Sequence, residues 1–405
     1  MYDSSTAAQE ISTGRQSSLP IVDQQGGRIR LTPRDEPRFV GEALLGTGGT
    51  GEVVRAADLD IGRRVAIKRL RDDRFRPSDV ARFVREIQLV GSLEHPNIVP
   101  LHDVGTDADN RVYAVMKFVD GMTLNELVNR LREGDATAHA RWDHTARTRL
   151  FLEICRGVAF AHDHDVLHRD IKPSNVMVGP EGEAQILDWG LAKRRDTPDL
   201  VDSFDEEPSL HAADLDPSAA PTWVPRSRRI SQGSSDFDTR EGAVFGTPPY
   251  MSPEQARGEE FDERSEVFAL GLLFWELLTL ADPLPGVEET AKQVDAASRR
   301  IVPHIMTMPR HASQAPVPGP LAWFVFRATR PQPEDRFPSV DAMIEELRRV
   351  ADGSFKVQCP STLQHRALGS LGRLVDRNPM LVPFVAFATL VSLVSVGVAI
   401  GLAIS

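Results

Sequence analysis

Residues 168–175 read HRDIKPSN and place two cations, a carboxylate and an amide in one short loop. Asp170, Lys172 and Asn175 follow one another in this order, and an apolar run leads into them. A solvated surface turn can have the same composition. The rest of the chain therefore decides whether this loop carries out chemistry.

A glycine-rich stretch lies upstream of this loop. Residues 45–53 read LGTGGTGEV, in which Gly46, Gly48 and Gly51 form the pattern G-x-G-x-x-G. Such glycines let the backbone bend closely over a polyphosphate and point amide groups at it. A dinucleotide-binding loop would need a helix directly after the glycines, but the strand-like run EVVRAAD follows. The motif alone leaves a plain glycine-rich hairpin open as the alternative.

A lysine and a glutamate follow the glycines at suitable positions. The apolar run VAIK ends in Lys68, and Glu86 lies on the next stretch with helical spacing. An ammonium group beside a phosphate cradle would neutralise charge that a nucleotide brings, and Glu86 can hold that ammonium by pairing with it. A solvent-facing lysine is the alternative for Lys68.

Taken together, these motifs resemble the protein-kinase superfamily over about residues 39–350. Three further matches follow in the order of that family, namely DWG at 188–190, SPE at 252–254 and Arg336. The resemblance implies an α+β, bilobal protein-kinase-like fold, with a small β-rich N-lobe and a large α-helical C-lobe. The roles given below to individual residues are those that these motifs have in the family.

The resemblance implies ATP as phosphoryl donor and Mg²⁺ as cofactor. Asp170 would accept or orient the hydroxyl proton of the substrate, and Lys172 would offset charge on the transferred phosphoryl group. Asn175 and Asp188 would hold the metal ions. Lys68, paired with Glu86, would grip the α- and β-phosphates, while Met116 would guard the back of the adenine pocket and backbone groups of Lys117 and Val119 would meet the adenine edge. The predicted nucleotide-binding residues are Leu45, Gly46, Thr47, Gly48, Gly49, Thr50, Gly51, Glu52, Val53, Ala66, Lys68, Glu86, Met116, Lys117 and Val119.

The acceptor class follows from the same resemblance. Lys172, two places after Asp170, looks like the serine/threonine-specific branch, and GTPPYMSPE with Thr247 is similar to the peptide-docking loop of that branch. The implied substrates are therefore serine and threonine hydroxyls of proteins. Glu254 and Arg336 are predicted to form a buried ion pair with no part in the reaction.

Three positions depart from the usual family pattern. Trp189 replaces a phenylalanine, Glu266 stands where an aspartate buttresses the catalytic loop, and Thr50 occupies the tip of the glycine loop where an aromatic residue is common. None of these removes a reacting group. A pseudokinase that acts as a nucleotide-binding or scaffolding module is the alternative, and a small-molecule kinase is disfavoured by the docking pattern at 246–254.

The segment from about 194 to 244 is rich in Asp, Ser and Pro and is predicted to be an insertion in the activation segment. Arg169 precedes the catalytic aspartate, an arrangement that in this family often pairs with a phosphate on that segment. Phosphorylation adds roughly −1.5 to −2 charges and would order the loop through Arg169. Thr239 is the preferred predicted site, followed by Ser231, Ser234 and Ser235.

The bulk composition limits the alternatives. A formal net charge of −11 argues against a protein that coats nucleic acid, which needs a basic surface. The two cysteines, Cys155 and Cys359, can build neither a disulfide scaffold nor a zinc cluster, so we expect a reducing compartment.

The C-terminal residues 380–405 contain no charged side chain and exceed the roughly 20 residues that cross a bilayer. Arg366, Arg373 and Arg377 precede them, with only Asp376 opposing, so the kinase-like domain is predicted to face the cytoplasm from a single-pass cell-membrane anchor. Within this span, Gly397 and Gly401 have the G-x-x-x-G spacing that lets two helices pack as a homodimer. The predicted organisation is a disordered segment at 1–36, a kinase-like domain at 37–350 with lobes at 37–119 and 120–350, a juxtamembrane linker at 351–379 and a transmembrane helix at 380–405.

Overall fold

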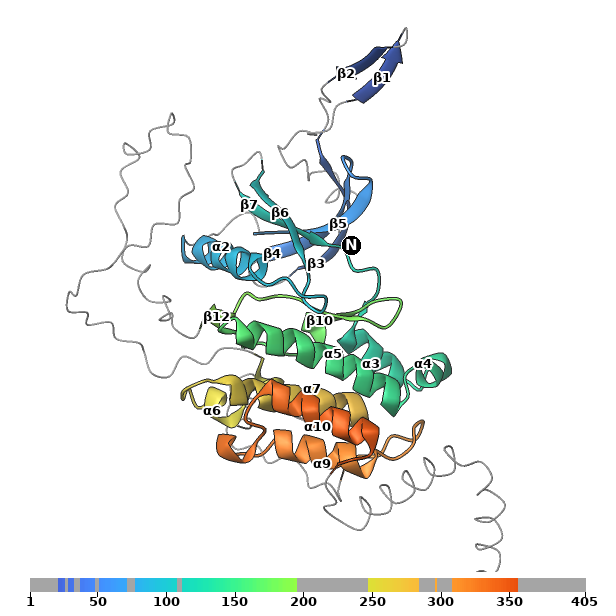
Figure 1. Ribbon diagram of the computed structural model, residues 1–405, viewed down its shortest axis with the longest axis vertical. Coiled ribbons are helices and arrows are strands. Elements are labelled where there is room, and N and C mark those ends of the chain that lie inside the picture. The colour runs from blue at the N-terminus through green and yellow to red at the C-terminus, as the bar shows by residue number, and fades with distance from the viewer. Residues whose placement is uncertain are drawn as a thin grey trace, which may run out of the picture.

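The computed structural model of the chain describes residues 21–25, 28–32, 37–47, 51–70, 77–107, 111–194, 247–283, 296 and 308–355. A lobe containing the main sheet and one helix lies against a larger helical lobe (Figure 1). The predicted division into a β-rich and an α-helical lobe is therefore present. The predicted phosphorylation sites upstream of Thr247 and the predicted span at 380–405 lie outside the described residues.

The sheet of the smaller lobe has five strands in the order β3-β4-β5-β7-β6, and all neighbours are antiparallel. The strands are β3 (Phe39–Thr47), β4 (Gly51–Asp58), β5 (Arg63–Leu70), β6 (Leu101–Thr106) and β7 (Val112–Lys117). The alternating apolar residues between Phe39 and Lys68 predict three antiparallel strands, and the run VYAVMKFVDG predicts a further strand. The structure confirms these as β3, β4, β5 and β7. β6 was not predicted, because this edge strand buries none of its residues fully and so shows no strong apolar alternation.

Helix α2 (Pro77–Gly91) packs on this sheet. Its buried Phe83 forms a small apolar cluster with Leu70 of β5 and Ala114 of β7. From its place near the start of the helical pattern, Asp79 is predicted to cap this helix, but it lies within the first turn. A carboxylate there still faces the positive end of the helix dipole, although it is not the capping residue.

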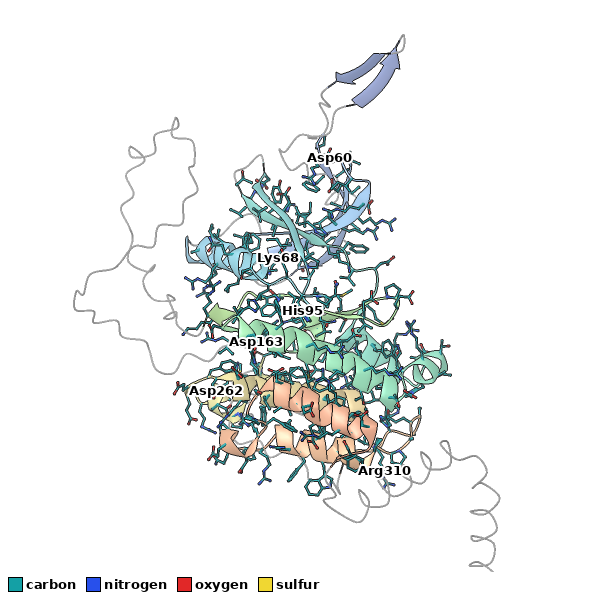
Figure 2. All side chains as sticks on the ribbon, viewed as in Figure 1. Asp60, Lys68, His95, Asp163, Asp262 and Arg310 are labelled. Carbon is teal, nitrogen blue, oxygen red and sulfur yellow. The ribbon has the colours of Figure 1, made fainter. Side chains whose placement is uncertain are left out.

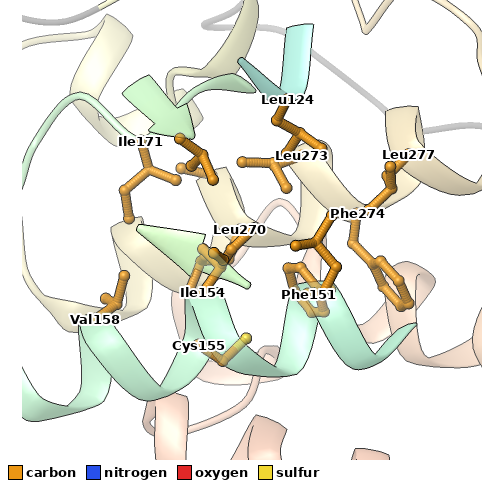
Figure 3. Close-up of a cluster of buried hydrophobic side chains, with 14 of the residues drawn as sticks. Leu124, Phe151, Ile154, Cys155, Val158, Ile171, Leu270, Leu273, Phe274 and Leu277 are labelled. Carbon is orange, nitrogen blue, oxygen red and sulfur yellow. The ribbon is translucent and has the colours of Figure 1, made fainter. Parts of the chain in front are cut away.

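The larger lobe is built around two long helices, α5 (His144–Asp163) and α7 (Glu263–Thr279). Every residue of α7 from Ser265 to Thr279 is buried, as expected of a helix surrounded by other elements. Figure 3 shows side chains of both helices meeting in the core, where the rings of Phe151 and Phe274 stack at 4.1 Å. Within the run FLEICRGVAFAH, Cys155 is predicted to be a small buried apolar residue, and it is part of this core.

The other helices of the described residues are α3 (Leu124–Arg132), α4 (Ala136–Arg141), α6 (Pro253–Ala256), α9 (Gly319–Ala328) and α10 (Val340–Asp352). The sequence predicts helices in TLNELVNRL, TRLFLEICRGVAFAHDH, EVFALGLLFWELLTL and SVDAMIEELRRVAD, and the structure confirms them as α3, α5, α7 and α10. α4 and α9 were not predicted. α9 carries apolar residues on most of its sides, so it lacks the one-sided pattern from which a surface helix is recognised.

Short strands and 3-10 turns hold the polar loops in place. The strands are β8 (Met122–Thr123), β9 (Val166–Leu167), β10 (Val176–Val178), β11 (Ala184–Ile186) and β12 (Lys193–Arg194), and the 3-10 turns are η1 (Pro173–Asn175), η2 (Pro248–Tyr250) and η4 (Pro333–Asp335). They form two small sheets, β11-β10-β8 and β12-β9. The loop at 168–175 thus leaves one paired strand, β9, and enters another, β10.

Two findings bear on the predictions made for the ends of the chain. β1 (Ile21–Gln25) and β2 (Arg28–Thr32) pair as an antiparallel hairpin, so the prediction of a disordered segment at 1–36 is wrong for these two strands. Among the residues that the structure describes, no helix combines the length and the apolar character that a membrane crossing requires.

Candidate active site

The ammonium group of Lys68 joins three separate segments of the chain. Its Nζ donates to Oε1 of Glu86 on α2 at 2.6 Å and to Oδ1 of Asp188, which follows β11, at 2.9 Å. The side chains of Lys68 and Glu86 are 17% and 11% exposed, whereas that of Asp188 is 52% exposed. Figure 2 shows Lys68 within the sheet-containing lobe and Asp163, at the end of α5, in the helical lobe. One carboxylate of this cluster therefore remains open to a ligand.

Burial and the neighbouring charges shift the pKa values of these three residues in different directions. Burial alone would lower the pKa of Lys68, but the two carboxylates outweigh it and raise the pKa, so the lysine stays protonated. Burial raises the pKa of Glu86 in spite of Lys68. For Asp188 burial acts in the same direction, yet the ammonium of Lys68 prevails and lowers the pKa. Asp188 is thus an ionised carboxylate at neutral pH.

A second cluster forms around Asp170. The hydroxyl of Thr247 donates to Oδ1 of Asp170 at 2.7 Å, and the ammonium of Lys172 lies 2.6 Å from Oδ2 of Asp170 and donates to the Thr247 hydroxyl at 2.7 Å. The amide of Asn175 donates to the backbone carbonyl of Asp170 at 2.9 Å and to its Oδ2 at 3.1 Å. The polar groups of the loop therefore converge on one carboxylate and on a hydroxyl from the 247–254 segment.

Backbone contacts connect the two clusters. The N–H of Leu187, next to Asp188, donates to the carbonyl of Asn175 at 2.8 Å. The Nε2–H of His168 donates to the carbonyl of Leu187 at 3.0 Å, and its ring packs against Trp189 with centroids 4.6 Å apart. The four residues to which the resemblance assigns the reaction and the metal thus lie in two contacting pairs, Lys68 with Asp188 and Asp170 with Asn175, joined through one short backbone link.

Two residues of this region have a left-handed backbone. Arg169 has φ +67° and Asp188 has φ +50°. Non-glycine residues rarely adopt this region, and where they do the surrounding structure must hold them. The buried carboxylate of Glu266 does so for Arg169: its Oε1 accepts the Arg169 N–H at 2.6 Å, and its Oε2 accepts from Nε2 of His162 at 2.5 Å. Glu266 therefore buttresses the loop despite its extra methylene.

Sequence comparisons agree with this geometry. Residues 39–212 match the protein kinase domain family. Serine/threonine-protein kinase PknD of Protochlamydia amoebophila is 32% identical over 335 residues, which cover 79% of this chain and 30% of that protein. A probable serine/threonine-protein kinase of Streptomyces coelicolor is 31% identical over 361 residues, covering 87% and 44%. PknD of Chlamydia abortus is 30% identical over 318 residues, covering 77% and 31%.

The chain contains a protein kinase domain. It spans less than half the length of the curated relatives that it matches.

In this kinase domain the glycine stretch joins β3 to β4 as a hairpin. Leu45, Gly46 and Thr47 end β3, and Gly51, Glu52 and Val53 begin β4, with Gly46 opposite Val53 and Thr47 opposite Glu52. The tip residues Gly48, Gly49 and Thr50 lie outside the described residues. The hairpin shape is compatible with both sequence-based alternatives, since it is the tip that would cover a phosphate.

Two residues of the glycine stretch also have structural reasons to be there. A Cβ at Gly51 would lie 2.7 Å from the carbonyl oxygen of Arg69, so only glycine fits against β5. Glu52 accepts from Nε of Arg69 at 2.6 Å. Part of the motif therefore serves the sheet and does not by itself report on a nucleotide.

The residues predicted to surround adenine lie where β5 and β7 pair. Ala66 is opposite Met116. The N–H of Lys117 donates to the carbonyl of Pro100 at 3.0 Å, so this amide is engaged within the kinase domain, while the following Val119 is buried. Met177 of β10 was not among the residues predicted to bind the nucleotide. It is half-buried between the fully buried Val176 and Val178, so it points away from their core, and its strand pairs with β8 just after Val119.

The predicted ion pair of the helical lobe is confirmed. Arg336 donates to both carboxylate oxygens of Glu254, at 2.6 and 2.8 Å, and Ser265 donates to Glu254 Oε1 at 2.7 Å. Arg336 further donates to the carbonyls of Arg330, Arg264 and Pro331. Both side chains are buried. Since Glu254 belongs to α6 and Arg336 follows η4, the pair fixes α6 within the kinase domain.

Proposed function

We propose that the chain is a serine/threonine protein kinase that transfers the γ-phosphoryl group of ATP to serine and threonine hydroxyls of proteins. The observation that carries this proposal is the contact between Asp170 and Thr247, in which a carboxylate accepts a hydrogen bond from an aliphatic hydroxyl at 2.7 Å. An acceptor hydroxyl needs the same kind of contact, because the carboxylate must orient it and receive its proton. The relatives described above are named as serine/threonine-protein kinases, in agreement with this acceptor class.

Charge neutralisation accounts for the neighbouring cations. Phosphoryl transfer passes through a loose transition state, so the protein contributes positioning and electrostatic stabilisation more than covalent chemistry. Lys172, within hydrogen-bond distance of both Asp170 and Thr247, would face the phosphoryl group during transfer. Lys68 would exchange its contact with Asp188 for the inner phosphates while Glu86 keeps it in place.

The side chains of Asn175 and Asp188 suit a magnesium ion, which prefers oxygen ligands. The Asn175 amide nitrogen donates to Asp170, which leaves its carbonyl oxygen as the ligand atom of that side chain. Asp188 is half exposed and its pKa is lowered by Lys68 against the effect of burial, so it offers an ionised carboxylate. A magnesium ion held by these two side chains would supply positive charge that offsets the charge of the phosphates.

For the adenine we propose a site between the two lobes, with Ala66 and Met116 on one side and Met177 on the other. The Val119 amide and the carbonyl of Lys117 would meet its edge, since the Lys117 amide already donates to Pro100. Met177 is added here because its side chain points away from the core and its strand pairs with β8, next to the segment that links the lobes.

The test compares the wild type with Asp170→Asn, using labelled ATP, Mg²⁺ and a generic protein acceptor. We expect incorporation above background only in the wild type, with ATP affinity retained in the variant. Equal, background-level incorporation in both proteins would instead identify a nucleotide-binding scaffold. Transfer to small molecules without transfer to any protein would contradict the acceptor class.

We further propose regulation by phosphorylation within 227–247. A cavity of ≈ 400 Å³ is lined by the cationic residues Arg169, Lys193 and Arg264, together with Glu260, Asp262 and Glu263. A phosphate there would meet Arg169 directly before Asp170. Mass spectrometry of the active protein incubated with Mg-ATP should find phosphate between residues 227 and 247, and its absence from that interval in active protein would contradict this proposal.

Membrane attachment is proposed on the sequence alone, from the uncharged stretch at 380–405 and the arginines before it. The full chain should sediment with membranes and resist extraction by high salt. A chain ending at residue 355 should be released, and equal membrane association of both would contradict the anchor.

A further inference from the structure

The backbone at Arg169, and with it the peptide that joins Arg169 to Asp170, has an unusual conformation. Arg169 has φ +67°, a conformation that costs an L-residue free energy and persists only where neighbouring groups hold it. The orientation of this peptide sets the direction in which the Asp170 side chain leaves the backbone. Groups that hold it therefore determine where the Asp170 carboxylate points.

Two of the groups that hold the backbone on either side of Arg169 belong to motifs discussed above. Glu266 accepts the N–H of Arg169, which belongs to the peptide that precedes this residue, at 2.6 Å. Nδ1 of His168 accepts the N–H of Asp170 at 3.3 Å, which is consistent with the neutral ring whose Nε2–H donates to Leu187. Both contacts fix amide hydrogens and leave the carbonyl end of the peptide to be held by another group.

That group is Gln255 of α6, whose Nε2 donates to the carbonyl oxygen of Arg169 at 3.2 Å. The side chain is half-buried and lies far along the chain from the loop. Phe261, from the segment after α6, holds the same residue by its side chain, with the Arg169 guanidinium 5.7 Å from the ring centroid. The carbonyl and the side chain of Arg169 are therefore both held by the segment that follows Thr247.

Gln255 is itself fixed in position. Its backbone N–H donates to the hydroxyl of Ser252, the N-cap of α6, at 3.2 Å. The preceding residue, Glu254, is tied to Arg336 by two short contacts. The amide of Gln255 thus extends from a turn that is anchored in the core of the helical lobe, so it acts as a rigid support for the loop.

We infer that Gln255 is a positioning residue for phosphoryl transfer: by clamping the Arg169 carbonyl it aims the Asp170 carboxylate, and it couples the 247–257 segment to the catalytic loop. This inference rests on the proposed kinase activity. Gln255 directly follows the predicted peptide-docking loop at 246–254 and is not one of the predicted nucleotide-binding residues. Its loss should therefore affect turnover and not ATP binding.

The first experiment replaces the donor by an apolar group of similar length, Gln255→Met. We expect kcat to fall about tenfold, since small misplacements of a reacting group are costly, while KM for ATP stays unchanged. Gln314→Met is the matched control. Gln314 also donates its Nε2 to a backbone carbonyl, that of Leu278 at 2.8 Å, but it lies outside the site, so its loss should leave kcat unchanged.

A second variant separates this clamp from simple packing. In Gln255→Glu an ionised carboxylate would face the Arg169 carbonyl and repel it, whereas the protonated acid can donate to it. The activity of Gln255→Glu relative to wild type should therefore rise as the pH is lowered, while the ratio for Gln255→Met stays flat. Identical pH profiles for the two variants would overturn the inference.

A readout that needs no activity distinguishes this inference from the proposed function. Amide hydrogen exchange of peptides covering 168–172 should be faster in Gln255→Met than in wild type and unchanged in Gln314→Met. Unchanged exchange in Gln255→Met would overturn the clamp whatever the kinetics show. Background transfer by the wild type would overturn the kinase proposal, and the exchange data would still decide on the clamp.

Discussion

The Lys68–Glu86–Asp188 cluster and the Glu254–Arg336 pair use similar groups at similar distances but differ in exposure. The Arg336 side chain is fully buried and that of Glu254 is 6% exposed, whereas Asp188 is 52% exposed. Arg336 donates to Glu254 and to three backbone carbonyls. In the first cluster, by contrast, one ammonium contacts two carboxylates, and one of these faces solvent.

This difference separates a structural charge from one that is available for binding. A buried pair whose groups are all hydrogen-bonded holds elements together, because breaking it leaves an uncompensated charge. In the Lys68 cluster two carboxylates share one ammonium, so the exposed carboxylate remains available to bind a ligand. Changes to the first cluster should therefore affect activity most, and changes to the second should affect stability most.

The largest expected effect is on activity. Lys68→Met should lower phosphoryl transfer by about 10²–10³-fold, the cost of losing one preorganised group that stabilises developing charge. Arg69→Met is the matched control, since Arg69 neighbours Lys68 on β5 and pairs with Glu52 at 2.6 Å instead of with the site. Steady-state transfer assays check both variants. An equal loss in Arg69→Met would show that the sheet, and not the ammonium, is responsible.

The next effect is on stability. Arg336→Met should lower the free energy of unfolding by about 3–5 kcal/mol, because the Glu254 carboxylate stays buried without its partner. Urea denaturation measures the change. The double variant Arg336→Met with Glu254→Leu should lose less than the single variant, since no charge remains buried, and an additive loss would contradict this explanation.

The pH dependence of stability sharpens the same comparison. Burial opposes ionisation of Glu254, but the hydrogen bonds and charge of Arg336 prevail and lower the pKa below the ordinary 4.5. The unfolded state therefore takes up protons first, so this contribution is complete above pH 4.5 and is lost as the pH falls towards the folded-state pKa. Urea midpoints between neutral pH and pH 3 should fall less steeply in Glu254→Gln than in wild type. Parallel curves would contradict the assignment.

The sequence was sufficient to predict those residues whose role requires one type of side chain at one place in a motif. Lys68, Asp170, Asn175 and Asp188 were singled out in this way, and the structure brings them together. The ion pair of Glu254 and Arg336 was predicted on the same basis. Their chemical roles remain proposals, because geometry shows which groups meet and not what they react with.

Other features could not be predicted, for physical reasons. The contact between Gln255 and Arg169 joins residues 86 positions apart through one amide, and neither periodicity nor composition reports such a pair. Met177 could have been noticed as the middle residue of the apolar run VMV, but only the burial of its two neighbours shows which side it faces. β6 lacked a signal because an edge strand needs little apolar surface.

The smallest expected effect concerns an ion pair near the same segment. Nε of Arg257 lies 2.6 Å from Glu259 Oε1, as close as the buried pair, but the two side chains are 42% and 52% exposed. Water already solvates both charges and salt screens them, so the contact adds little to folding. Arg257→Ala should leave the urea midpoint unchanged at low and high salt, and also kcat, although it lies only two residues from Gln255. A loss like that of Arg336→Met would mean that distance, and not burial, determines what these pairs contribute.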